Sequence, residues 1–91
     1  MRETEIEKYL KYKIEQIGGK SFKFVSPGNN GVPDRIVLYR GQIYFVEIKK
    51  AGENLSPIQQ YRKKQFEKLG FAVDVIDSKE KVDDFIEIHT T

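Results

Sequence analysis

Two runs of β-forming residues, separated by only two turn-forming residues, constrain the fold of this chain more than any other feature. Residues 35–39 and 42–49 are dense in Ile, Val, Tyr and Phe, and Arg40-Gly41 lies between them. This spacing predicts a tight antiparallel hairpin. A strand–helix–strand passage over residues 43–76 follows, which favours a parallel pairing in the same sheet. The centre of the chain therefore predicts a mixed sheet.

A first helix is predicted ahead of this hairpin. Apolar residues recur at three- and four-residue steps from residue 6 to residue 17, which is the period of one helix face. Thr4 and Glu7 have the Thr-x-x-Glu spacing of a capping box, which predicts the start of the helix. Gly18-Gly19 predicts its end, because glycine accepts the left-handed conformation beyond a helix terminus.

Two further helices are predicted after the hairpin. Ser56 is a favourable N-cap, Pro57 suits the first helical position, and Gly70 predicts the end of that helix. Ser78 can cap a last helix. The apolar faces of these two helices are expected to consist of Ile58, Tyr61, Phe66 and Leu69, and of Val82, Phe85 and Ile86.

Short apolar runs at residues 22–25 and 71–76 predict two more strands. Residues 26–31 and 51–55 are rich in turn formers and predict loops. The predicted order is αβββαβα, an α/β fold in one domain over residues 1–91 with a mixed central sheet and helices on both faces.

Composition excludes several classes of protein. The 91 residues include 16 basic and 14 acidic side chains, so a net charge of +2 leaves any polyanion binding to local placement of Lys and Arg. The absence of cysteine excludes disulfides, thiolate zinc sites and cysteine nucleophiles. No segment approaches about 20 apolar residues, so we expect no membrane span and an intracellular protein.

Three polar side chains are brought together by the predicted hairpin. Asp34 and Glu47 are thirteen residues apart and lie at similar distances from the turn, so they should face each other. Glu47 and Lys49 should point to one face of their strand, with Ile48 on the other. Two carboxylates and a lysine suit a Mg²⁺ site that acts on phosphate esters. The simpler alternative is a solvated strand face with cross-strand ion pairs.

A wider set of residues resembles the VRR-NUC family, the virus-type nuclease domain of the PD-(D/E)XK superfamily, which has a restriction-endonuclease-like core. The resemblance covers most of the chain. Its segments here are Glu3 and Glu7, Lys23, Ser26-Pro27-Gly28, Gly31-Val32-Pro33-Asp34-Arg35, Phe45-Val46-Glu47-Ile48-Lys49, and Leu55-Ser56-Pro57-Ile58-Gln59.

The resemblance implies a role for each motif residue. Asp34 and Glu47 would bind the metal, Mg²⁺ or Mn²⁺, and Lys49 would assist catalysis. The Ile48 carbonyl would add a ligand, and Gln59 would lie near the site.

The family also uses a glutamate of the first helix, and two candidates remain open. Spacing before Ile6 favours Glu3, whereas spacing before Gly18 favours Glu7. Glu7 could instead serve only the capping box with Thr4. In the same way, Gln59 has the spacing of a capping box with Ser56 and could have either role or both.

Nucleic-acid contacts are predicted around this site. The candidates are Lys20, Lys23, Arg35, Lys50, Arg62 and Lys63, with Ser26 and Asn30 of the Ser26–Gly31 loop. Any one of the basic residues is more often a solvated surface charge than a phosphate contact. His89 is expected to have no functional role.

The resemblance implies a metal-dependent endonuclease that hydrolyses DNA phosphodiester bonds. It also implies a homodimer selective for branched DNA such as Holliday junctions, because two sites related by a two-fold axis suit symmetric nicks. The expected location is the cytoplasm, and the protein could be a viral protein that acts in a bacterial host. Two alternatives are a non-catalytic nucleic-acid-binding module and a restriction or repair endonuclease acting on flaps or duplex.

Overall fold

The computed structural model describes all residues from 1 to 91 and has the predicted αβββαβα order. Its elements are α1 (Glu3–Gln16), β1 (Lys20–Lys23), β2 (Arg35–Tyr39), β3 (Gln42–Ile48), α2 (Pro57–Lys68), β4 (Val73–Ile76) and α3 (Lys79–Thr90). The strands form one sheet in the order β1-β2-β3-β4. The first three are antiparallel and β4 is parallel to β3, so the predicted mixed sheet is confirmed.

The β2–β3 hairpin turns at the two residues that the sequence indicates. Tyr39 pairs with Gln42, and Arg40 and Gly41 between them have φ values of 48° and 75°. Two consecutive residues with positive φ form the turn whose twist matches that of the flanking strands. The turn therefore fixes the register of every residue pair down to the far end of the hairpin.

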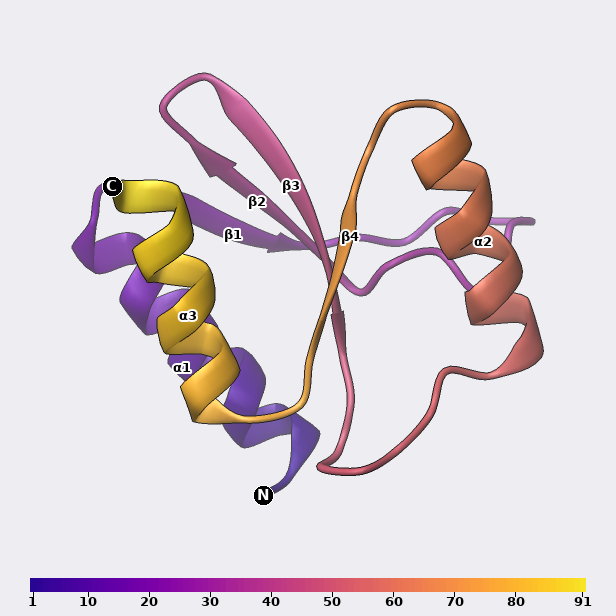
Figure 1. Ribbon diagram of the computed structural model, residues 1–91, viewed down its shortest axis with the longest axis horizontal. Helices are drawn as coiled ribbons and strands as arrows, with labels where there is room; N and C mark the ends of the chain where they lie inside the picture. The colour runs from indigo at the N-terminus through magenta and orange to yellow at the C-terminus, as the bar shows by residue number, and fades with distance from the viewer.

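Helices cover both faces of the sheet, as predicted, but to different extents. Figure 1 shows α1 and α3 together on one side of the sheet and α2 on the other. The buried core lies under α1 and α3 and consists of Ile6, Leu10, Ile14, Val37, Val46, Ile48, Ile76, Val82 and Phe85. Most of the hydrophobic stabilisation therefore comes from this layer.

Helix α2 packs less closely than its sequence predicts. None of its residues is buried, and Ile58, Tyr61 and Leu69 of the expected apolar face are exposed. Phe66 packs edge-on against the sheet, with its ring centroid 4.9 Å from that of Phe45. The prediction of a buried face on this helix was wrong, because α2 is the only helix on its side of the sheet and no second helix covers its apolar residues.

Three predicted boundaries also differ from the structure. The backbone carbonyl of Arg2 accepts the first helical bonds of α1, and Thr4 forms no cap, so the Thr4–Glu7 capping box is wrong. Strand β1 begins two residues early, because Gly18 has a φ of +89° and turns the chain at once. Strand β4 is shorter than residues 71–76.

None of the three helices combines the length and hydropathy of a membrane-spanning segment.

Candidate active site

The hairpin register places Asp34 across from Glu47, at the end of the hairpin that lies away from the turn. Arg35 pairs with Val46, so the next residue on each strand is Asp34 and Glu47. The Asp34 carboxylate accepts a hydrogen bond from the Ile48 backbone N–H at 2.9 Å, and its carbonyl accepts one from the Phe24 N–H at 2.8 Å. Asp34 is thus held through its backbone and its side chain.

Alternation along β3 assigns Glu47 to the face of the sheet that α2 partly covers. Tyr44 packs edge-on against Phe85 of α3, whereas Phe45 packs against Phe66 of α2. Successive side chains of a strand point to opposite faces, so the side chain of Glu47, two residues after Phe45, lies on the same face of the sheet as Phe45. Ile48 lies on the other face, in the core.

Glu47 is a buried carboxyl group with an unsatisfied oxygen. The residue is 3 % exposed, and its Oε1 atom has no hydrogen-bond partner. Burial, followed by the contact with Asp34 and its charge, raises the pKa of Glu47 to about 9, although Lys49 acts in the opposite direction. A buried polar atom without a partner is uncommon in folded proteins and calls for a ligand or ion.

Lys49 continues the strand and is also buried. Its backbone N–H donates to the Ile76 carbonyl at 3.0 Å, which extends the parallel pairing by one residue. Its ammonium Nζ lies 3.3 Å from Oε1 of Glu53. Glu53 was not predicted, because it lies in the loop after β3 and only the folded loop brings it to Lys49.

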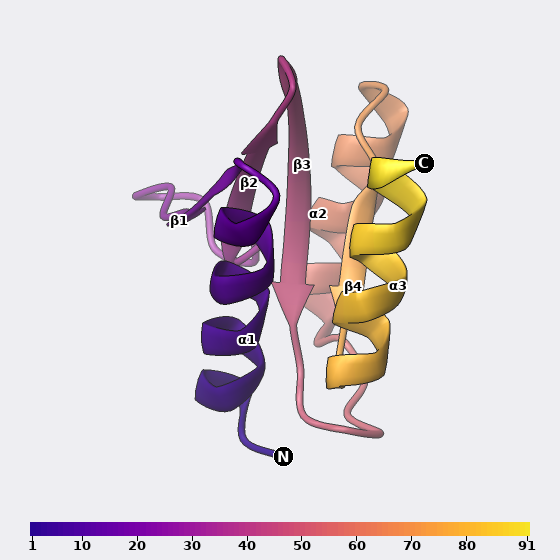
Figure 2. The ribbon, with the colours of Figure 1, turned by 90° about the vertical axis from the view of Figure 1, so that its left-hand side faces the viewer.

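The structure separates the two candidate glutamates of α1. The negative charge of Glu3 adds to the raised pKa of Glu47, after the larger effects of burial and of Asp34. Figure 2 shows the start of α1 beside the segment that follows β3, and the later turns of α1 beside the strand itself. Glu7 lies one turn later and its Oε2 is 3.5 Å from Nη1 of Arg35.

The oxygen-rich donor set fits a hard divalent cation. Asp34 and Glu47 face each other, and the free Oε1 of Glu47 is the atom that a cation would satisfy. No three side chains of the His, Cys, Asp and Glu types are close enough to hold a metal by themselves. Backbone carbonyl and water oxygens would therefore have to complete the coordination.

Comparisons with known proteins identify the family of the chain. No protein-family model matches the chain. "Putative nuclease p44" of Acyrthosiphon pisum secondary endosymbiont phage 1 is 47 % identical over 81 residues, which cover 88 % of this chain and 87 % of that protein. A solved structure described as a VRR_NUC domain superposes with a TM-score of 0.88 at 37 % identity, covering 98 % of this chain and 97 % of the other. The chain belongs to the VRR-NUC nuclease family.

Gln59 has the capping role in this VRR-NUC domain. Its Oε1 accepts from the Ser56 backbone N–H at 2.9 Å, and its own N–H donates to Ser56 Oγ at 3.3 Å. This reciprocal capping box fixes the start of α2. A further role of the Gln59 side chain in the site stays a prediction.

The predicted nucleic-acid contacts fall into two groups. Arg35 and Arg62 are engaged within the protein, Arg35 with Ser21 and Glu7, and Arg62 with the Asn30 carbonyl at 2.8 Å. Ser26 Oγ accepts from the Asn29 side chain. The side chains that are exposed and in no ion pair are Lys23, Asn30 and Lys50, whereas Lys20 pairs with Glu15 and Lys63 with Glu67.

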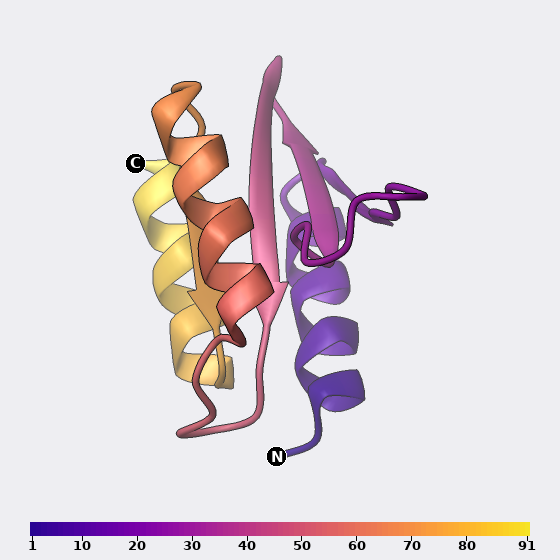
Figure 3. The same ribbon diagram turned by 90° about the vertical axis from the view of Figure 1, so that its right-hand side faces the viewer.

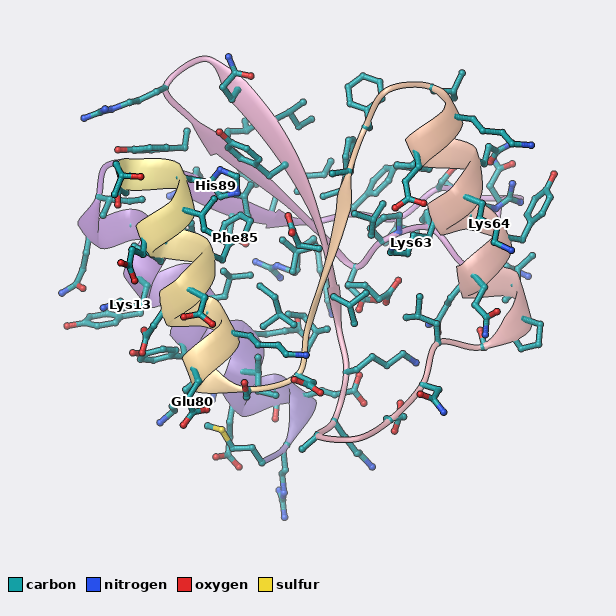
Figure 4. The ribbon with its side chains drawn as sticks, in the orientation of Figure 1. Lys13, Lys63, Lys64, Glu80, Phe85 and His89 are labelled. Atoms are coloured by element: carbon teal, nitrogen blue, oxygen red, sulfur yellow. The ribbon has the colours of Figure 1, made fainter.

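His89 lies on the opposite side of the sheet from the carboxylate pair. Figure 4 shows it beside Phe85 on α3. Its ring centroid is 4.1 Å from that of Tyr44 and 4.5 Å from that of Phe85. His89 therefore packs against aromatic rings on the face of the sheet that lies away from Asp34 and Glu47.

The loop between β1 and β2 is fixed against α2 near the site. Figure 3 shows this loop beside α2. Gly31 has a φ of +85°, and a Cβ added there would lie 2.7 Å from the Ile58 backbone carbonyl oxygen. Gly28 has nearly the same φ, +82°, but an added Cβ would meet nothing within 4 Å.

These two glycines give a matched pair of variants. Gly28→Ala should lower the free energy of unfolding by about 1–2 kcal/mol, the strain of a side chain in the left-handed region. Gly31→Ala should lower it by about 1–3 kcal/mol more, because the new methyl group overlaps backbone atoms. Urea unfolding of both variants measures the difference. Equal losses would show that the loop does not pack closely against α2.

Proposed function

We propose that this protein is a metal-dependent endonuclease that hydrolyses DNA phosphodiester bonds. The observation that carries the proposal is the buried carboxylate pair Asp34–Glu47, with one oxygen unsatisfied and Lys49 two residues along the same strand. Side chains of this kind, buried together, are uncommon except where charge is needed for chemistry.

Each residue has a part in the proposed mechanism. Asp34, Glu47 and the Ile48 carbonyl would hold Mg²⁺ or Mn²⁺, and water molecules would complete the coordination because no third acidic side chain is close enough. When bound, the cation would lower the pKa of a water molecule and polarise a phosphoryl oxygen. The Lys49 ammonium orients the attacking water and offsets the negative charge that develops on the phosphate.

Contacts within the protein hold the side chains of Asp34, Glu47 and Lys49 in place. The Ile48 N–H holds one oxygen of Asp34, and Glu53 holds the Lys49 ammonium on its exposed side. The buried position of Glu47 keeps water from competing for its carboxylate. These constraints would place the reacting groups before DNA binds, which reduces the entropy lost at the chemical step.

The preferred substrate is proposed to be branched DNA, including Holliday junctions, cut by a homodimer. A domain of 91 residues has one proposed site, and symmetric nicks in a four-way junction need two. A two-fold dimer supplies two equivalent sites from one surface. The proposal rests on the resemblance to stand-alone members of the family and on this symmetry.

A nicking assay tests activity and substrate together. We expect cleavage of a four-way junction with Mg²⁺ or Mn²⁺, slower cleavage of linear duplex of the same sequence, and none in EDTA. Light scattering should give twice the mass of one chain. Cleavage in EDTA would disprove the metal dependence, and equal rates on junction and duplex would disprove the junction preference.

A further inference from the structure

Arg35 is a buried cation that the proposed chemistry does not use. Its side chain is 11 % exposed. Its Nε donates to Ser21 Oγ and its Nη2 to the Ser21 carbonyl, both at 3.1 Å, while Nη1 contacts Glu7 at 3.5 Å. Ser21 is itself 4 % exposed. The planar guanidinium thus joins β2 to β1 and to α1 at one point.

The position of Arg35 relates it to the proposed metal ligand Asp34 and to the first helix. It directly follows Asp34 in the chain and points to the opposite face of the sheet. Its partner Glu7 lies four residues after Glu3, so the two glutamates are on the same side of α1. The Arg35–Glu7 contact therefore connects the strand that carries Asp34 to the helical turn that carries Glu3.

From these contacts we propose that Arg35 and Glu7 form a positioning pair that fixes the start of α1 relative to β2. The pair anchors the start of β2, and so holds the adjacent Asp34 in the position where its carboxylate faces Glu47. Glu7 is then a positioning residue and not a ligand, and Arg35 does not contact phosphate. This inference rests on the proposed metal-dependent function.

The competing roles would each break a contact that the structure contains. If Glu7 bound the cation, the Arg35 guanidinium would lose its only acidic partner while remaining buried. If Arg35 bound DNA, it would have to leave two hydrogen bonds to Ser21. Removing one partner of a buried charge pair is strongly unfavourable, so the present arrangement should persist.

Binding of Mn²⁺ without DNA tests the pair directly. Electron paramagnetic resonance titrations measure the Kd, and circular dichroism confirms that each variant is folded. Glu7→Leu and Arg35→Met should each raise the Kd about tenfold, as is typical when a residue behind a metal ligand is lost. The double variant should be no worse than either single one, because both remove the same contact. Glu7→Gln, whose amide oxygen can still accept from Arg35, should bind nearly as the native protein does.

Other outcomes would overturn the proposal. Equal losses in Glu7→Gln and Glu7→Leu, with native binding in Arg35→Met, would make Glu7 a ligand. Native Mn²⁺ binding but a weaker salt dependence of DNA binding in Arg35→Met would make Arg35 a phosphate contact. A lower melting temperature with unchanged Kd in every variant would leave the pair a structural role only.

Two controls separate this inference from the proposed function. Glu5→Leu, at an exposed position of α1 in no ion pair, should bind Mn²⁺ normally. If Arg35→Met does not fold, Arg35→Lys replaces it, since one ammonium cannot contact Ser21 and Glu7 as the guanidinium does. If the native protein binds no Mn²⁺, the metal-dependent function fails. If the native protein binds Mn²⁺ and Glu7→Leu binds equally well, only the positioning pair fails.

Discussion

Replacing Lys49 with methionine should lower the single-turnover rate of DNA cleavage by about 100-fold or more, the effect of losing one group that stabilises transition-state charge. Methionine retains most of the aliphatic length, so the side chain, which is 10 % exposed in the native protein, remains packed. The lost ammonium interacts with charge that develops during the reaction and not with the bound DNA. Fluorescence anisotropy in EDTA should therefore show nearly unchanged DNA binding.

Two comparisons make the Lys49 result interpretable. Lys68→Met removes an equal charge from an exposed position at the end of α2 that forms no ion pair, and should leave the rate unchanged. Asp34→Asn should abolish cleavage, because it weakens the metal site itself. Normal cleavage by Lys49→Met would contradict the proposed mechanism. A large loss of DNA binding would show that Lys49 holds the substrate.

The sequence predicts the parts of the fold and site that depend on local chemistry. Arg40-Gly41 and the alternation of the flanking strands are enough to bring Asp34 opposite Glu47. Ser56-Pro57 marks the start of α2 within one residue, since capping is decided by neighbours in the chain. The resemblance supplies the family, and the comparisons confirm it.

Features that depend on distant packing are not predictable in this way. Glu7 has the spacing of a cap, yet it contacts Arg35, 28 residues away. Arg35 looks like a solvated base in the sequence, and its burial follows from where α1 crosses β1 and β2. The choice between Glu3 and Glu7 is equally invisible, because both lie on one helix side and only the three-dimensional contacts distinguish them.

The second large effect concerns stability in the absence of metal. The pKa of Glu47 in the folded protein is raised to about 9 from its ordinary value of 4.5, so the folded state retains a proton that the unfolded chain releases. Because the pKa of Glu47 is raised on folding, this stabilisation is fully present at pH values below the pKa in the unfolded chain. It is lost as the pH rises toward the pKa in the folded protein. Metal-free protein should therefore lose stability between pH 4.5 and 9, by up to about 1.4 kcal/mol per pH unit, the slope for one proton.

Glu47→Gln isolates this contribution from that of other carboxyl groups, such as Asp74, whose pKa is also raised by burial. Without metal, the variant should lose less stability than the native protein as the pH rises. Near the upper end of the range its free energy of unfolding should exceed that of the native protein. With Mg²⁺ the order should reverse, because the cation replaces the proton on Glu47 and its stabilising effect should increase with pH. Urea unfolding at several pH values, with EDTA or Mg²⁺, measures all four curves.

Parallel curves for the two proteins in EDTA would mean that Glu47 does not bind a proton in the folded state. A Mg²⁺ effect that persists in Glu47→Gln would place the cation elsewhere, and the carboxylate pair would then need another explanation.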